Sequence, residues 1–298
     1  MARKRRGRAI SGWIVLDKPV GVTSTTAVST VRDALRAAKA GHAGTLDPLA
    51  SGLLPVAIGE ATKVVSMVME SEKSYRFTVQ WGQERDTDDA EGTPTAESAS
   101  RPDRAAIEAA LSHYLGEIEQ VPPVYSAIKV AGERAYDMAR EGRPPVLAAR
   151  QVWIGSLTLL DCPDADHAEF VMTCGKGAYV RSLARDLGRA LGCFAHVTAL
   201  RRTRVGPFHE ENAISLDIVR QLRHKDELDE LLSPVETALA DIPALAITGS
   251  EADRLKCGQA IRVPQKLEGT VYATTDGRPV ALVTVQNGEV RPVRVFNL

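Results

Sequence analysis

Residues 41–52 have the sequence Gly41-His42-Ala43-Gly44-Thr45-Leu46-Asp47-Pro48-Leu49-Ala50-Ser51-Gly52, and the rest of the chain can be interpreted outward from this stretch. Its glycines permit positive φ angles and the close approach of another segment. Asp47 directly precedes a proline, which disfavours helix at Asp47 and favours an extended or turn conformation. An isolated Asp-Pro pair is usually a turn in which the aspartate side chain bonds its own backbone. A functional role for Asp47 therefore requires partners from elsewhere in the chain.

The overall composition is that of a soluble globular protein, with 298 residues of which 44% are hydrophobic and 25% charged. No apolar run approaches the roughly 20 residues that span a bilayer. The N-terminus carries basic residues without an apolar segment behind them, so it does not have the pattern of a secretory signal. We therefore expect a cytoplasmic protein without membrane association.

The distribution of charge bears on the choice of partner. A net charge of −1 is less basic than is usual for a protein that binds nucleic acid. The positive charge is nevertheless clustered, and a local basic surface can attract a polyanion even on a neutral protein. The clusters are a basic N-terminal tail, residues 1–11, and the group Arg201, Arg202 and Arg204.

Cofactor motifs are missing from the sequence. Its cysteines, Cys162, Cys174, Cys193 and Cys257, form no CxxC pair and have no metal-ligand spacing with the histidines. This pattern argues against a metal site or a disulfide framework and predicts buried, reduced thiols. The glycine-containing turns lack the pattern of a phosphate-binding loop. We therefore expect neither a metal nor a nucleotide cofactor.

The first half of the chain predicts alternating strands and helices. Thr23 or Ser24 can cap a helix that runs to about Ala38. Residues 74–81 alternate as a half-buried strand, and on this pattern alone Tyr75 is a core aromatic. The polar stretch 86–101 predicts an exposed loop. Further predicted elements are strands at 12–17 and 52–58, helices at about 61–69, 103–115 and 134–141, and an extended segment at 122–130.

Residues 179–191 follow helical periodicity, with an arginine every four residues opposite the apolar side. Such a stripe, here Arg181, Arg185 and Arg189, is usually a solvated face. Arg181 differs because it lies in the first turn after a Gly-Lys-Gly loop, where its side chain can point into a cleft. Further strands are predicted at 151–160, 168–173 and 196–205, and regular alternation in the last places Leu200, Arg202 and Arg204 on one face.

The last segment of the chain changes character after Ile242-Pro243. A short helix near 250–257 precedes three strand-like runs at 270–274, 279–285 and 290–295. The runs are joined by Asp276-Gly277 and Asn287-Gly288, which are strong hairpin signals. A unit of about 55 residues is near the lower limit of independent stability, so we expect it to pack on the larger domain.

Three segments closely resemble, in order, the motifs of the TruB family, the bacterial tRNA pseudouridine-55 synthases. They are GWIVLDKPVGVTS at 12–24, HAGTLDPLASGLL at 42–54 and KGAYVRSLARDLG at 176–188. The central GTLDPxAxG signature is highly specific, and the resemblance extends over almost the whole chain. Ala178 stands where the family usually has threonine, and no role assigned below falls on that position.

The resemblance implies a mixed α/β (α+β) fold. A catalytic pseudouridine synthase domain at residues 12–243 would have a twisted, largely antiparallel central sheet flanked by helices. A small β-rich, PUA-like RNA-binding domain would occupy residues 244–298. The implied activity is conversion of uridine 55 in the T-loop of tRNA to pseudouridine, without cofactor or metal. The expected partner is the T-arm stem-loop of tRNA, and we expect a monomer with no obligate protein partner.

The chemistry of this reaction explains the residue types in the motifs. The N1–C1′ bond breaks, the uracil turns and C5 joins C1′, and an ionised aspartate can act as nucleophile or base in that sequence. The resemblance gives this role to Asp47, with Arg181 beside it to orient the carboxylate. The uridine must be flipped out of the folded RNA and held by stacking, for which Tyr75 matches the family's aromatic. The implied substrate contacts are His42, which enters the space vacated in the T-loop, Tyr179 and Leu200 on the pocket wall, and Lys18 and Lys129 as phosphate contacts or structural support.

Three alternatives remain open at this stage. Basic clusters and base flipping would also suit a tRNA-folding chaperone that acts independently of catalysis. The same C1′ chemistry could end with water, as in a glycosidase that acts on nucleosides, although no second carboxylate falls in the matched motifs. A guide-RNA-dependent relative is the third alternative, and the short C-terminal domain argues against it.

Overall fold

The computed structural model describes residues 7–264 and 267–298, and most of the described chain belongs to one large sheet with helices packed on it. Arg3, Lys4, Arg5 and Arg6 of the predicted basic tail lie outside the described residues. The strands of the large sheet are β1 (Gly12–Lys18), β2 (Ala40–His42), β3 (Ser51–Ile58), β4 (Lys73–Trp81), β7 (Gly116–Gln120), β10 (Arg150–Asp161), β11 (His167–Cys174), β12 (Ala195–Val205), β13 (Phe208–His209) and β14 (Ile214–Ser215).

The order of the large sheet is β14-β1-β3-β12-β4-β11-β10-β7, with β2 beside β3 and β13 beside β12. Most neighbours are antiparallel, but β12 is parallel to β3 and β1 is parallel to β14. The strand β12 thus lies between β3 and β4, in the interior of the sheet, and brings residues near 200 beside residues near 52 and 76. This arrangement confirms the mixed α/β fold with a largely antiparallel sheet.

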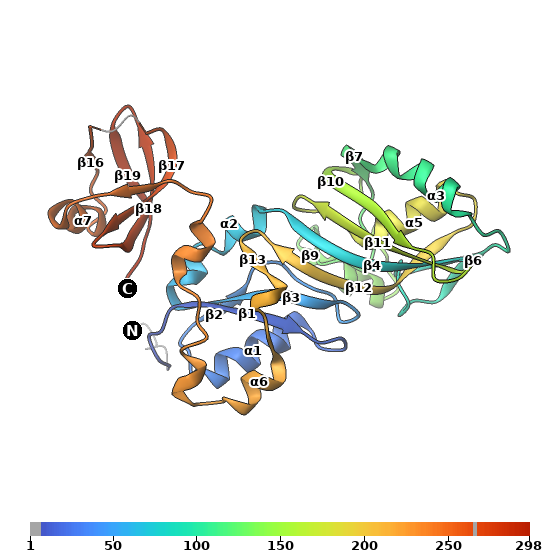
Figure 1. Cartoon of the computed structure of the whole chain (residues 1–298), viewed down its shortest axis with the longest axis horizontal. Coiled ribbons are helices and arrows are strands. Elements are labelled where there is room, and N and C mark those ends of the chain that lie inside the picture. Colours follow the sequence, from blue (N-terminus) through green and yellow to red (C-terminus); the bar gives the residue numbers. More distant parts are fainter. Residues whose placement is uncertain (1–6, 265–266) are drawn as a thin grey trace.

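Helices cover the sheet at its two ends (Figure 1), with α1 and α6 near β1 and β3, and α3 and α5 near β4, β10 and β11. The α-helices of this part are α1 (Ser24–Ala34), α2 (Val65–Glu70), α3 (Arg104–Leu111), α4 (Ala135–Arg140), α5 (Val180–Ala190) and α6 (Leu216–Gln221). Short 3-10 helices are η1 (Gly59–Lys63), η2 (Ser112–Tyr114), η3 (Glu210–Asn212), η4 (Asp226–Leu228) and η5 (Val235–Leu239).

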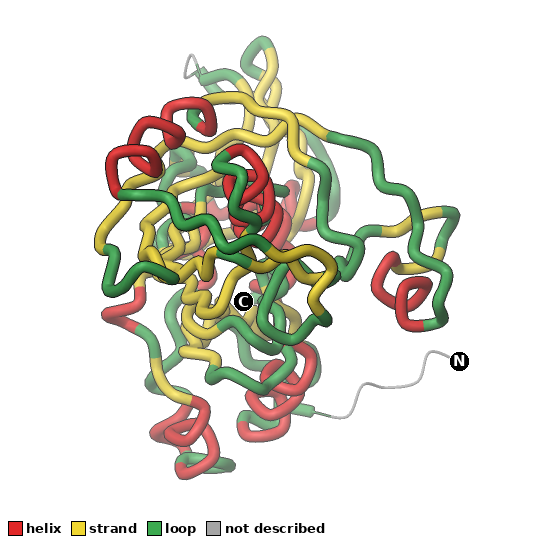
Figure 2. Tube along the Cα trace, turned by 90° about the vertical axis from the view of Figure 1, so that its right-hand side faces the viewer, coloured by secondary structure: helices red, strands yellow, loops and turns green. Residues whose placement is uncertain are grey.

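Two short hairpins lie outside the large sheet. They are β5 (Gln83–Arg85) with β6 (Pro94–Glu97), and β8 (Lys129–Val130) with β9 (Glu133–Arg134). In the side view of Figure 2, β8, β9 and α4 project from the main body at the right. The segment predicted as extended at 122–130 therefore leads out of the body and into this projecting hairpin.

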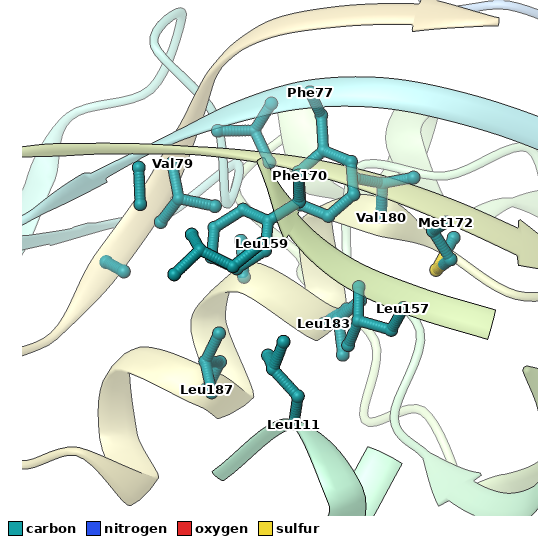
Figure 3. Close-up of a cluster of buried hydrophobic side chains, with 14 of the residues drawn as sticks. Phe77, Val79, Leu111, Leu157, Leu159, Phe170, Met172, Val180, Leu183 and Leu187 are labelled. Atoms are coloured by element: carbon teal, nitrogen blue, oxygen red, sulfur yellow. The ribbon is translucent and has the colours of Figure 1, made fainter. Parts of the chain in front are cut away.

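The largest hydrophobic core lies between the sheet and the helices α3 and α5 (Figure 3). Phe77 and Val79 of β4 and Phe170 of β11 face Leu183 and Leu187 of α5, and all five are almost completely buried. The predicted alternation of β4 explains why Phe77 and Val79 share this side. This core fixes α5 against β4 and β12, so the first turn of α5 is held at a defined place beside the sheet.

The helix α1 is shorter than predicted. Thr23 is its N-cap, as the sequence indicates, because the Thr23 hydroxyl accepts the amide of Thr26. The helix ends at Ala34 and not near Ala38, because Arg36 adopts a left-handed φ of 49° and the amide of Ala37 bonds back to the carbonyl of Arg32. The sequence offered no glycine to mark this end.

The C-terminal segment forms a separate five-stranded sheet in the order β15-β17-β18-β19-β16, with one helix against it. Asp276 and Asn287 have φ angles of 49° and 51°, as the predicted hairpin turns require. The sheet packs on the larger body through Phe296, which joins a core cluster with Trp13. Its elements are β15 (Ala244–Ala246), α7 (Gly249–Lys256), β16 (Ile261–Arg262), β17 (Gly269–Thr275), β18 (Arg278–Gln286) and β19 (Glu289–Val295).

The cysteines are less uniformly buried than predicted. Cys174 and Cys193 are buried thiols, but Cys162 is partly exposed and Cys257 is exposed because it follows the end of α7 at the surface. Among residues 7–264 and 267–298, no group of histidine, cysteine, aspartate or glutamate side chains has the arrangement of a metal site. In the same residues, no helix has the length and apolar composition needed to cross a membrane.

Candidate active site

A cavity of about 250 Å³ lies where the loop before β3, the strands β4 and β12, and the loop into α5 meet. Five residues singled out in the sequence line it, although they come from four separate parts of the chain: Asp47, Tyr75, Tyr179, Arg181 and Leu200. The antiparallel register explains the meeting, because Leu200 of β12 lies opposite Phe77 of β4, two residues from Tyr75. Asp47 therefore has the distant partners that a functional role requires.

Asp47 forms an ion pair with Arg181, with 2.8 Å between the carboxylate and a guanidinium nitrogen. The Asp47 side chain is 38% exposed and the Arg181 side chain only 4%. The loop is fixed just before Asp47, because the Ser24 hydroxyl accepts the amide of Leu46 at 2.8 Å and donates to its carbonyl at 2.9 Å. A solvent-accessible carboxylate is thus held by a buried arginine, an arrangement that orients a charged group toward a ligand.

Arg181 is itself held from several sides. It lies in the first turn of α5, and its guanidinium donates to the carbonyls of Thr87 and Tyr125 at 2.8 and 2.9 Å. The carboxylate of Asp89, which is buried, lies 3.5 Å from the same guanidinium. Arg181 therefore bridges Asp47 to the segment around residue 88, and it has little freedom to move.

The prediction of an exposed loop at 86–101 is wrong at residues 88 and 89, which are buried, and at residues 94–97, which form the strand β6. Asp88 and Asp89 are almost completely buried, because they face the arginines of α5. Asp88 forms an ion pair with Arg185 at 2.9 Å. Arg185 lies one helical turn after Arg181 on α5. Arg185 is buried as well, so the predicted solvated arginine stripe holds only for Arg189, whose side chain is 53% exposed.

The buried Asp88 carboxyl predicts a measurable pH dependence of stability. Burial raises its pKa from 3.8 to about 6, against the opposing effect of Arg185. Between pH 3.8 and about pH 6, the Asp88 carboxyl binds more protons in the native protein than in the unfolded chain. Its contribution to the free energy of unfolding is therefore largest below about pH 4, and it is lost as the pH rises to about 6. We expect the free energy of unfolding of the wild type, relative to Asp88→Asn, to be larger at about pH 4.5 than at about pH 7. Urea denaturation of both proteins measures this difference, and equal values at the two pH values would contradict the prediction.

Tyr75, Tyr179 and Leu200 form the walls of the cavity around Asp47. Burial raises the pKa of the Tyr75 hydroxyl, so the hydroxyl is neutral at physiological pH. The backbone of Tyr179 is fixed by Gln120, which accepts its amide at 2.7 Å and donates to its carbonyl at 3.1 Å. The guanidinium of Arg150 lies over the Tyr179 ring at 5.2 Å. These contacts give the cavity a defined aromatic wall.

Three further residues of the lining were not singled out as site residues from the sequence. They are Lys73, Lys176 and Arg202. Lys73 precedes Tyr75 by two residues on β4, and extending the predicted strand 74–81 by one residue would have placed it on the face of Tyr75. Burial lowers the pKa of Lys73 to about 8, and its ammonium donates to the carbonyls of Met69 and Ser71. Lys176 lies in the Gly-Lys-Gly loop and pairs with Glu70.

The other three predicted contact residues do not line the cavity. His42 belongs to β2 and is partly buried, and its pKa is lowered by burial and by the charge of Arg202. Lys18 is completely buried and donates to the carbonyls of Pro19 and Val22 in its own turn. Lys129 is exposed on the projecting strand β8. Of the two roles considered for Lys18, these hydrogen bonds favour structural support.

Family models match nearly the whole chain. The model of the TruB family pseudouridylate synthase N-terminal domain matches residues 32–180. The model of the tRNA pseudouridylate synthase B C-terminal domain matches residues 181–240, and that of the tRNA pseudouridine synthase II C-terminal segment matches residues 242–297.

Curated proteins are similar over nearly the whole of this chain. The tRNA pseudouridine synthase B of Bradyrhizobium diazoefficiens is 56% identical over 304 residues, which cover 99% of this chain and 88% of that protein. The protein of the same name from Caulobacter vibrioides is 52% identical over 309 residues, which cover 100% of both chains.

Solved structures with the same fold include chains from larger complexes. A chain in the crystal structure of a Cbf5-Nop10-Gar1 complex has a TM-score of 0.74 and 27% identity, covering 96% of this chain and 84% of that chain. A chain in the structure of an H/ACA RNP bound to a substrate RNA containing 2′-deoxyuridine has a TM-score of 0.74 and 26% identity, covering 100% of this chain and 92% of that chain. The resemblance found in the three motifs is confirmed, and the chain belongs to the TruB family of pseudouridylate synthases.

Proposed function

We propose that the chain converts uridine 55, in the T-loop of tRNA, to pseudouridine, with Asp47 as the catalytic carboxylate. The observation that carries the proposal is the 2.8 Å ion pair between Asp47 and Arg181 inside a cavity walled by Tyr75 and Leu200. Relatives named tRNA pseudouridine synthase B, similar over the whole chain, support tRNA as the substrate.

The cavity suits a base that has left its stack. Extruding a nucleotide from folded RNA costs a few kcal/mol, which stacking and apolar contact in the enzyme offset. The Tyr75 ring and the Leu200 side chain line the same cavity as Asp47, so a uracil held between them would lie beside the carboxylate. Arg181 keeps the Asp47 carboxylate oriented while the base enters.

The reaction requires no oxidant, because uridine and pseudouridine are isomers. The N1–C1′ bond breaks, the uracil rotates, C5 bonds to C1′, and the proton lost from C5 is balanced by the proton gained at N1. A charged carboxylate beside the sugar and the base can act as nucleophile or base in these steps. Asp47 is the cavity-lining carboxylate that has both the exposure and the charged partner for this role.

The domain arrangement supports a second contact with the RNA. We assign catalysis to residues 12–243 and additional RNA binding to the PUA-like segment 244–298, which packs on the catalytic part through Phe296.

We expect the purified chain to act as a monomer without a partner protein. Light scattering of the protein with and without tRNA measures the number of protein copies in the free and the RNA-bound state.

The direct test is to map pseudouridine in an unmodified tRNA transcript after incubation with the purified protein alone. We expect modification at uridine 55, and none in a matched transcript that carries cytidine there. Free uracil would instead indicate a nucleoside glycosidase. Activity that appears only when a guide RNA is added would contradict the stand-alone enzyme proposed here.

Tyr75 provides a graded test of stacking. Tyr75→Phe keeps the aromatic ring, whereas Tyr75→Leu removes it, so we expect only the leucine variant to lose RNA affinity. The expected loss is about 1–3 kcal/mol, the range found when an aromatic that stacks on a base is removed. Dissociation constants for a T-arm stem-loop measure this effect. Equal affinities of the two variants would contradict the stacking role.

A further inference from the structure

Arg202 lies in the middle of the site, although the proposed reaction gives it no role. Its strand, β12, runs between β3 and β4, and the register places Arg202 opposite Gly52 of β3 and Tyr75 of β4. The residue is only 1% exposed and lines the same cavity as Asp47. A charged group buried this deeply is stable only when its donors are satisfied.

The Arg202 guanidinium is satisfied by backbone carbonyls. Nε donates to the carbonyl of Leu53 at 2.8 Å, and a terminal nitrogen donates to the carbonyl of Gly44 at 3.0 Å. The other terminal nitrogen lies 3.5 Å from the carbonyl of Thr45. No ion pair involves this guanidinium within the described part of the chain. Arg202 therefore joins the start of β3 to the loop that carries Asp47.

The glycines on either side of Asp47 leave room for Arg202. Gly44 has a φ of +101°, and a Cβ atom there would lie 3.3 Å from a terminal nitrogen of Arg202. Gly52 has a φ of +95°, and a Cβ atom there would lie 2.3 Å from the carbonyl oxygen of Arg202. Both positions therefore need glycine, for backbone conformation and for space. The Arg202 side chain therefore packs directly against the loop that carries Asp47.

We infer that Arg202 is a positioning residue, whose guanidinium fixes the loop 44–47 so that the Asp47 carboxylate meets Arg181. The inference rests on the function proposed above for this cavity. The planar guanidinium bonds several carbonyls at once, which a lysine ammonium on a flexible stem does not reproduce. A misplacement of about 1 Å can lower a reaction rate about 100-fold, so the chemical step depends on Arg202 more than RNA affinity does.

The charge of Arg202 also acts on titratable groups near it. Burial raises the pKa of the Tyr75 hydroxyl, and the charge of Arg202 opposes that rise. The same charge adds to the effect of burial in lowering the pKa of His42 and of Lys73. One guanidinium thus holds the catalytic loop and influences the pKa of the groups Tyr75, His42 and Lys73.

The test compares Arg202→Lys and Arg202→Gln with the control Arg201→Gln. Arg201 is the next residue along β12 but pairs with Asp17 and Glu210, so its removal breaks ion pairs without touching the loop. Three quantities are measured: the dissociation constant for tRNA, the single-turnover rate constant at saturating enzyme, and the hydrogen–deuterium exchange of the amides of residues 43–47, 49 and 50. We expect both Arg202 variants to bind tRNA normally, to react about 100-fold more slowly and to exchange these amides faster.

A merely structural role would give a different result. With enzyme in excess, partial unfolding leaves both the amplitude and the rate constant of the single turnover unchanged as long as the folded fraction still saturates the tRNA, and Arg201→Gln shows what lost stability alone does. A folded Arg202→Lys protein with the wild-type rate constant and wild-type exchange would overturn the inference. If the wild type forms no pseudouridine, the proposed function fails, and the exchange comparison still decides whether Arg202 fixes the loop.

Discussion

Asp47→Asn is expected to abolish pseudouridine formation while leaving the fold and RNA binding nearly intact. Asparagine has almost the same shape, but it has no charge and cannot serve as nucleophile or base. Arg181 keeps its bonds to the carbonyls of Thr87 and Tyr125 and its contact with Asp89, so the buried guanidinium stays neutralised. We expect the rate to fall on the order of 10⁴-fold or more, as when one member of a catalytic group is removed.

The measurements are product yield under single-turnover conditions, the dissociation constant for tRNA and the urea midpoint. Asp217→Asn is a suitable control, because the Asp217 side chain is 78% exposed on α6. Substantial product from Asp47→Asn would remove Asp47 from its proposed role.

The wild type and Asp47→Asn also test the chaperone alternative. Equal promotion of tRNA folding by the two proteins would support an activity independent of catalysis. Absence of any promotion would exclude it.

Strands and turns could be predicted because their signals are local. A strand with one buried face must alternate, and the predicted run 74–81 is confirmed as β4, with Phe77 and Val79 in the core. The two turns of the C-terminal sheet were equally accessible, because Asp-Gly and Asn-Gly tolerate the positive φ angles that tight hairpins need. Elements of this kind depend on neighbours within a few residues.

The burial of charged groups could not be predicted, because its causes are distant in sequence. Asp88 pairs with Arg185, 97 residues later, and nothing near either residue indicates that they meet. Helical spacing placed Arg185 opposite the apolar side of α5 but did not show which segment packs there. Strand alternation placed Arg202 on the face of Leu200, but its role was missed, since its partners lie on β3 and in the loop around Gly44. Only the resemblance linked Asp47 to Arg181 before the structure placed them together.

Arg181→Met is expected to lose both activity and stability, for two separable reasons. The Asp47 carboxylate loses the partner that orients it, and the buried Asp89 carboxylate loses its cationic partner. Removing one partner of a buried ion pair typically costs about 3–5 kcal/mol, so we expect a loss of stability in that range. Arg189→Met is the control, because Arg189 lies on the same helix but its side chain is 53% exposed, so the loss of its pair with Glu84 should cost less stability than the loss of the buried Arg181.

A double variant separates the two effects of Arg181. Adding Asp89→Asn to Arg181→Met removes the unpaired buried charge, so the urea midpoint should recover much of what the single variant lost. Activity should not recover, because Asp47 still lacks the guanidinium that lies 2.8 Å from it in the wild type. Recovery of the rate constant together with stability would mean that Arg181 only supports the fold. Recovery of stability alone would place the contribution of Arg181 to the reaction in its contact with Asp47.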